Sequence, residues 1–431
     1  MKLLVYVEIL TPRVQYIFGH LLGEMLGIEH ELTTEISSFI DYSGPKISYS
    51  RTVQQGLHFQ ATDLLFSSEV QSIEISSIEH DGVKAFFPVE QSVLPFDPFA
   101  AAFYFLSRYE EYTNTERDRH GRFLAENSAL TKSGSLTVPV VDHFAKMVLE
   151  KIQMAFPEVH GQLKEHKDLF TIDVDNGFAF KGRGLRSKAA ILNAQLKGKY
   201  AEAKERKAVL AGTLQDPYDN YKKICEYVND PKALIFFVLF AERGENDHGA
   251  DPGLKDFQEA IKEMSKGAEV GIHPSYASND VTGVLEAQAE QLGQVIGKSI
   301  IKSRQHFLRF DLPTTYRRLA SVGITEEHSM GYADRAGFRA GTCRPFKWYD
   351  LSNEQKTDLN VIPFACMDTA YADHLGLGPE GASTKIKKVL GHVRQVNGPL
   401  VSVWHDRVLA GRDEYTGWWK VFEGSIDLCR S

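Results

Sequence analysis

The stretch Leu169-Phe170-Thr171-Ile172-Asp173-Val174-Asp175-Asn176-Gly177 indicates a buried strand that ends in two carboxylates and an Asn-Gly turn. Residues i and i+2 of a strand point to the same side. We therefore expect Asp173 and Asp175 to face one place at the carboxyl end of this strand. Two like charges so close require a cation, a shared proton or ample water. The alternative interpretation is that Asp175 only belongs to an Asx-type turn with Asn176.

Beyond residue 168 the chain repeats strand-then-helix units. The expected strands are 169–173, 233–240, 269–272, 303–308, 338–341, 361–366 and 399–404, and the clearest helix lies near 281–296. Alternation of β and α elements predicts a parallel sheet, either open or closed into a barrel. The Lys- and Arg-rich segment 181–207 predicts a long helical insertion with a solvated face. A lid over an anionic or sugar substrate is the alternative for that segment.

The first part of the chain predicts a small α/β domain. We expect a strand at 2–9, a helix over 14–26, short strands that include 72–75 and 83–87, a helix opened by Asp97-Pro98, and an amphipathic helix over 141–152. The predicted domains are 1–165 and 168–431. His120, Glu110 and Glu111 are candidates for a second site, although such residues more often cap helices or form surface ion pairs.

Composition excludes several classes of protein. A chain of 431 residues with 43% hydrophobic and 25% charged residues is typical of a protein with a sizeable core. The net charge of −8 argues against a general nucleic-acid binder. The apolar runs are too short to span a bilayer, and Glu8 ends the first of them, so we expect no signal peptide and a cytoplasmic location. The four scattered cysteines show no metal-type pairing and predict reduced, structural thiols.

Polar residues with useful chemistry follow one apolar run after another: His273, His306, Asp368, and the pair His405-Asp406. In barrels and open α/β sheets the active site lies at the carboxyl ends of the strands. Each histidine alone is more often a satisfied core residue. Together with the Asp pair they predict one shared site. One Asp and two His are a common ligand set for a catalytic Zn²⁺-like ion.

Four motifs make the chain resemble a divergent polysaccharide deacetylase: Thr171-Ile172-Asp173-Val174-Asp175, His273-Pro274-Ser275-Tyr276, Gly337-Phe338-Arg339-Ala340-Gly341-Thr342 and Trp404-His405. The resemblance covers roughly residues 168–420 and implies an incomplete (β/α) barrel. Two further motifs, Asp97-Pro98-Phe99 and Ser107-Arg108-Tyr109-Glu110-Glu111, resemble the uncharacterised domain that precedes such barrels in some bacterial proteins.

This resemblance implies a role for each site residue. Asp173 corresponds to the general base, Asp175 and His273 to metal ligands, His405 to the general acid, and Arg339 to the arginine that orients the catalytic carboxylate. The sequence departs from the family at two places. Ala277 stands where a second His is usual, and Val174 separates two Asp residues that are usually adjacent. His306, in the next β/α unit, is the candidate for the missing ligand.

The implied function is removal of acetyl groups from an N- or O-acetylated carbohydrate with the help of a divalent metal, expected to be zinc. An alternative is a degenerate barrel that binds carbohydrate without hydrolysing it, since Ala277 cannot bind a metal ion. An amidohydrolase-type enzyme would need a His-x-His on the first barrel strand. Asp173-Val174-Asp175 stands there instead.

Overall fold

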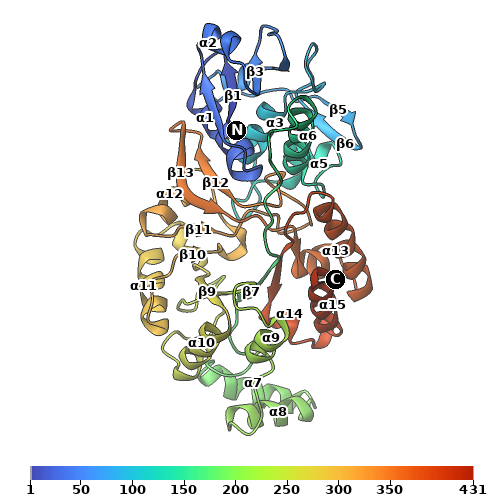
Figure 1. The fold of residues 1–431 in the computed structure, drawn as a ribbon. Coiled ribbons are helices and arrows are strands. Elements are labelled where there is room, and N and C mark those ends of the chain that lie inside the picture. The colour runs from blue at the N-terminus through green and yellow to red at the C-terminus, as the bar shows by residue number, and fades with distance from the viewer. Residues whose placement is uncertain (1, 431) are drawn as a thin grey trace.

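The structure, a computed structural model, describes residues 2–430. Its larger sheet has nine strands in the order β12-β13-β11-β10-β9-β8-β7-β15-β14 (Figure 1). All neighbours pair in parallel except the β12–β13 hairpin. The strands are β7 (Leu169–Val174), β8 (Leu234–Val238), β9 (Glu269–Ile272), β10 (Lys302–Ser303), β11 (Glu326–Glu327), β12 (Phe346–Asp350), β13 (Gln355–Val361), β14 (Cys366–Met367) and β15 (Val401–His405).

One segment, 355–367, joins the two edges of the parallel sheet. The Ile362 N–H donates to the Glu327 carbonyl beside β11 at 2.8 Å, and the Ala365 N–H donates to the Val401 carbonyl beside β15 at 3.1 Å. The sheet therefore curls round on itself, and the carboxyl ends of its parallel strands meet at one rim. The expected α/β class with a barrel-like parallel sheet is confirmed.

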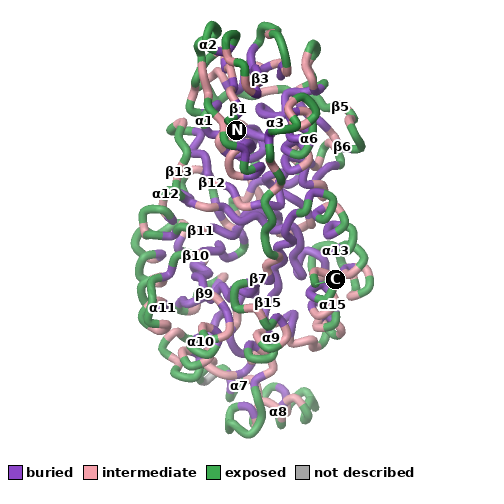
Figure 2. Tube along the Cα trace, viewed as in Figure 1, coloured by how far each residue is buried: buried purple, intermediate pink, exposed green. Residues whose placement is uncertain are grey.

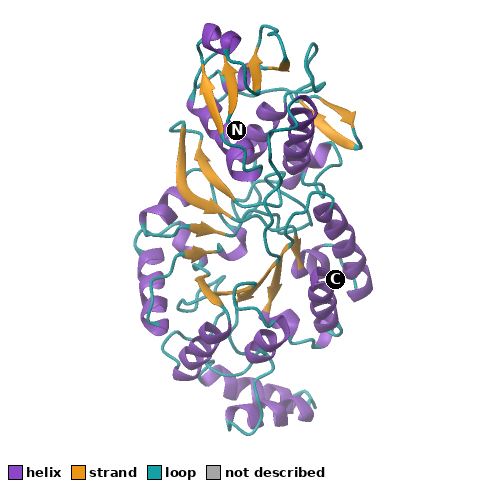
Figure 3. Ribbon diagram, in the orientation of Figure 1, coloured by secondary structure: helices purple, strands orange, loops and turns teal. Residues whose placement is uncertain are grey.

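Helices cover the outside of this sheet (Figure 3). They are α9 (Tyr221–Val228), α10 (Lys255–Gly267), α11 (Val284–Ile296), α12 (Thr314–Ser321), α13 (Pro379–Arg394) and α15 (Trp418–Arg430). Helix α10 shows why they dock, since Phe257, Ile261 and Met264 recur at helical spacing and are buried. The basic insertion forms two helices, α7 (Leu185–Leu196) and α8 (Tyr200–Leu210). Within residues 2–430, none of the helices has both the length and the apolar character that a membrane span requires.

The N-terminal part is a second, smaller α/β unit. Its parallel sheet has the order β2-β1-β3-β4 (His30–Thr33, Leu3–Val7, Lys46–Ser50, Leu57–Gln60), and β5–β6 (Ser77–His80, Val83–Phe86) form a hairpin. Its helices include α1 (Pro12–Phe18), the buried α3 (Pro98–Leu106) and α6 (Val140–Ala155). Asp97 caps α3 by accepting from the N–H groups of Phe99 and Ala100.

The largest hydrophobic cluster contains buried residues of both parts of the chain, and Figure 2 shows buried segments in both. Buried ion pairs also cross between them, namely Glu111 with Arg339 and Asp142 with Arg344. The two parts therefore share an extensive, well-packed interface. The exact division of the chain near residue 165 stays a prediction.

Five local expectations are wrong. Segment 72–75 forms no strand, β10 covers only the start of 303–308, and β11 was not expected. Segment 361–366 is strand only at its two ends, with Val361 in β13 and Cys366 in β14. Segment 338–341 turns instead of extending. Gly337, with φ of 137°, lies against Leu136 so closely that a Cβ there would be 2.5 Å from the Leu136 side chain. Packing against the N-terminal part thus overrides the apolar pattern of this segment.

Candidate metal centre

The polar strand ends converge, as expected, on one pocket of about 240 Å³ that includes Asp173, Asp175, His273, His306 and His405 in its lining. Register explains part of this convergence, because β15 pairs with β7 so that His405 is the Cα partner of Asp173. The His405 Nε2 atom lies 4.0 Å from Asp173 Oδ2 and 3.9 Å from Asp175 Oδ2. Residues far apart in sequence thus form one site.

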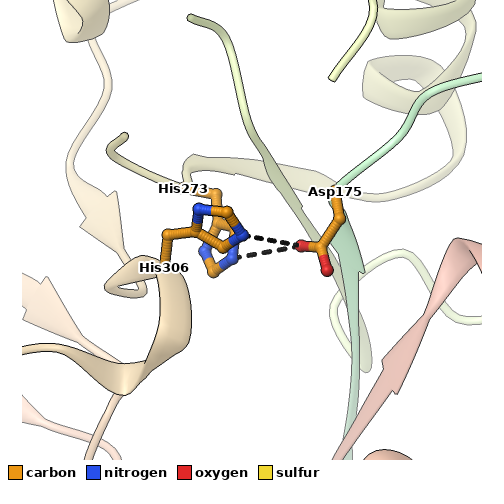
Figure 4. A group of neighbouring side chains, drawn as sticks. All are labelled: Asp175, His273 and His306. Carbon is orange, nitrogen blue, oxygen red and sulfur yellow. Dashed lines mark ion pairs between the residues drawn. The ribbon is translucent and has the colours of Figure 1, made fainter. Parts of the chain in front are cut away.

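Asp175, His273 and His306 form a group that can hold a metal ion (Figure 4). Asp175 Oδ1 lies 3.3 Å from His273 Nε2 and 3.9 Å from His306 Nε2, and the three donor atoms lie within 4.8 Å of one another. Ligand atoms bound tetrahedrally at about 2.0–2.1 Å from Zn²⁺ are roughly 3.4 Å apart. The two distances from Asp175 lie within about 0.5 Å of that value, so side-chain adjustment can bring the three donor atoms around such an ion.

Both imidazoles are oriented by acceptors behind them. His273 Nδ1 lies 2.6 Å from the Arg304 carbonyl, and His306 Nδ1 lies 2.9 Å from Asp247 Oδ1. Because a carbonyl and a carboxylate can only accept, each Nδ1 carries a proton, and each Nε2 faces Asp175, where it can give its lone pair to a metal ion once the imidazole is neutral. Asp175 Oδ1 is itself buried without a hydrogen-bond partner among the described residues. A buried carboxylate oxygen that has no hydrogen-bond partner and faces two imidazole nitrogens suits a cation.

The charge of Asp175 is strongly stabilised. Burial opposes its ionisation, yet the imidazoles of His273, His405 and His306 hold its pKa well below the ordinary value. Its other oxygen, Oδ2, accepts from Arg407 Nη1 at 3.0 Å. Asp175 is therefore ionised at neutral pH, as a metal ligand must be.

His405 is held by a second carboxylate, Asp368. The His405 Nδ1 atom lies 2.6 Å from Asp368 Oδ1, and its backbone N–H donates to Asp368 Oδ2 at 2.7 Å. Burial lowers the pKa of His405, but the negative charges of Asp368 and Asp175 outweigh it and raise that pKa to about 9. At neutral pH His405 is thus a protonated imidazolium that can give up a proton.

The expected partner of Asp173 needs correction. Arg339 does not orient this carboxylate, because its Nε and Nη2 donate to Glu111 at 2.8 and 2.7 Å. Arg304 takes that place. Its Nη1 donates to Asp173 Oδ1 at 3.1 Å and to Thr171 Oγ1 at 2.7 Å. Asp173 is buried, so this guanidinium places a positive charge beside it and fixes its position.

Sequence reasoning missed three residues at this site. Arg304 stands two positions before His306, and that spacing was the only available signal for it. Asp247 lies in the loop after β8, and no motif marks it. Arg407 follows His405-Asp406 and reaches back to Asp175. Ala277 is exposed in the short helix Tyr276–Asn279, while His306 joins the group instead.

The second candidate site is occupied by structural ion pairs. Glu110 and Glu111 are buried and pair with Arg108 at 2.8 and 2.7 Å. His120 contacts Tyr276 of the barrel, with its Nδ1 at 3.2 Å from the hydroxyl oxygen. These three residues thus form no site of their own.

Comparisons with known proteins found a family model that matches one part of the chain and solved structures that match 61% of it. Residues 3–157 match DUF7033, a family of unknown function. No match was found among curated proteins. Residues covering 61% of the chain are similar in structure to polysaccharide deacetylases.

Three solved structures illustrate the similarity. A Mycobacterium smegmatis protein assigned as a polysaccharide deacetylase has 15% identity and a TM-score of 0.40, with 61% of this chain and 83% of that chain covered. The allantoinase Puue has 12% identity and a TM-score of 0.39, with 61% of this chain and 84% of that chain covered. The polysaccharide deacetylase Bc1974 of Bacillus cereus has 11% identity and a TM-score of 0.30, with 61% of this chain and 88% of that chain covered. Because these scores are low, the function is inferred from the side chains of the site.

Proposed function

We propose that this chain is a metal-dependent hydrolase that removes acetyl groups from an N- or O-acetylated carbohydrate. One observation carries the proposal. A group suited to a divalent ion, Asp175, His273 and His306, lies in the same pocket as a second carboxylate, Asp173, and a carboxylate-backed imidazole, His405. The chemistry belongs to residues 168–431, and zinc is the ion that best fits one carboxylate and two imidazoles.

The chemistry of deacetylation suits these residues. An amide or ester carbonyl is a poor electrophile, and a divalent ion supplies Lewis acidity that polarises it and makes water a better nucleophile. Asp173, held by the Arg304 guanidinium, accepts the proton of the attacking water. His405, protonated at neutral pH, donates a proton to the departing amine or alcohol. A bond from water oxygen to the acyl carbon replaces the C–N or C–O bond, and acetate is released.

The shape of the pocket is consistent with a small acyl group. Its lining combines the polar groups with the apolar side chains of Leu308, Ala333 and Met367. These can contact the acetyl methyl group while the carbonyl faces the polar side. A volume of about 240 Å³ suits a substituent that projects from a sugar better than it suits a buried polymer chain.

A second candidate function is carbohydrate binding without hydrolysis. The ion pair between Arg407 and Asp175 favours it, because a guanidinium there already neutralises part of the charge that would attract a cation. Under this alternative the protein would bind sugar at the same pocket and contain no stoichiometric metal.

Metal analysis combined with an acetate-release assay tests the proposal. Protein purified without added metal should contain about one divalent ion per chain. It should release acetate from N-acetylglucosamine oligomers or O-acetylated xylo-oligosaccharides. A chelator should abolish this release, and zinc should restore it. A bound ion without acetate release would contradict the deacetylase. Sugar binding without any ion, measured by calorimetry, would favour the second candidate.

A further inference from the structure

A loop of the N-terminal part, Asp118–Arg122, reaches the candidate metal pocket, and Arg122 is one of the pocket-lining residues. The loop is internally well ordered. Asp118 accepts from the backbone N–H groups of His120 and Arg122 at 2.8 and 2.9 Å, and from Arg122 Nε at 2.7 Å. Gly121 takes the left-handed conformation, with φ of 77°, that closes the turn. The 118–122 loop is therefore a preformed element.

The loop faces an unusual turn in the barrel. Directly after His306, Phe307 and Leu308 have φ of 60° and 52°. A non-glycine residue is strained in the left-handed region, because its Cβ comes too close to the backbone. Such a turn persists only where surrounding contacts hold it. Because this turn follows His306 directly, its backbone geometry affects where the His306 imidazole lies.

The 118–122 loop makes those contacts. Arg122 Nη1 donates to the Phe307 carbonyl at 2.9 Å, and the rings of His120 and Phe307 lie 5.1 Å apart. From the barrel side, Arg309 Nε donates to the His120 carbonyl at 3.2 Å. The 118–122 loop and segment 307–309 thus bind each other through Arg122 on one side and Arg309 on the other.

We propose that the 118–122 loop positions His306 for metal binding, and that this is a function of the N-terminal part of the chain. Arg122 is the principal positioning residue, since it binds the carbonyl of the first left-handed residue. The N-terminal part then completes the metal site of the barrel. This inference rests on the proposed function only in requiring that a metal ion binds at His306.

Metal affinity and amide exchange test this positioning in the full-length protein. In Arg122→Ala, affinity for Zn²⁺ and Co²⁺, measured by competition with a chromogenic chelator, should fall by about 10- to 100-fold. The visible spectrum of bound Co²⁺ should change as His306 shifts. Arg122→Lys keeps a donor and should restore part of the affinity. The matched control is Arg51→Ala, which removes an exposed arginine of the same part that pairs with Glu8. Arg51→Ala should change neither the metal affinity nor the Co²⁺ spectrum.

Hydrogen exchange separates this inference from the proposed function, because it requires neither metal nor turnover. Amides of segment 303–310 should exchange faster in Arg122→Ala than in Arg51→Ala. Unchanged exchange, or unchanged metal affinity and Co²⁺ spectrum in folded Arg122→Ala, would overturn the positioning role whether or not the protein releases acetate. If Arg122→Ala fails to fold, His120→Ala provides the same test by removing the ring contact with Phe307.

Discussion

Replacing Glu111 with glutamine should destabilise the protein by about 3 kcal/mol at neutral pH. The Glu111 side chain is 3% exposed and lies between two guanidinium groups, with Arg339 Nη2 and Arg108 Nε both at 2.7 Å. Burial raises the pKa of Glu111, but Arg339 and Arg108 outweigh it and lower that pKa from 4.5 to about 2. At about 1.36 kcal/mol per pKa unit, this difference gives the stated free energy.

The pH dependence of the effect follows from its sign. Because the folded-state pKa is depressed, the stabilisation by Glu111 is fully present above pH 4.5 and is lost as pH falls toward 2. The difference in free energy of unfolding between wild type and Glu111→Gln should therefore shrink on acidification. By pH 3.5 it should reach roughly 60% of its neutral value.

Urea unfolding followed by tryptophan fluorescence measures this difference at several pH values. Glu79→Gln is the matched control, because Glu79 pairs with Lys84 on the surface of the same part, where ion pairs contribute little. A difference for Glu111→Gln below about 1 kcal/mol at pH 7, or one that does not shrink in acid, would refute the reasoning. Such a result would also reopen the assignment of Arg339 to a structural ion pair.

Three further predictions concern the metal pocket. His306→Ala should lose metal, measured on folded protein by elemental analysis, because a third ligand is removed, whereas His392→Ala on α13 should keep it. Equal metal content in both would contradict a ligand role for His306. Asp173→Asn should keep its metal and stop releasing acetate, since only the proton acceptor is lost, and loss of metal would show that Asp173 is a ligand instead. Activity should fall as pH rises through the pKa of His405, which Asp368 raises and which a bound ion lowers by offsetting the charge of Asp175. Asp368→Asn removes a negative charge that raises this pKa, so the fall should move to lower pH, and an unmoved profile would exclude His405 as the acid.

Local periodicity was enough to predict part of this site. Because side chains alternate along a strand, the spacing of Asp173 and Asp175 alone placed both carboxylates on one side of β7, whatever the rest of the chain does. The alternation of strands and helices likewise predicted a parallel sheet with its polar residues at one rim. These conclusions depend on spacing within short segments, which the sequence displays directly.

Only the tertiary structure decided which groups meet at that rim. Arg339 and Arg304 both lie in expected strands, 338–341 and 303–308, and the sequence offers no measure of which one reaches Asp173. The choice depends on the interface with the N-terminal part, where Glu111 binds Arg339 and leaves Asp173 to Arg304. The contacts that Asp247 and the 118–122 loop make at the site also depend on the tertiary structure. Their contacts join residues 59 and 185 positions apart, and chain folding, not local pattern, brings such residues together.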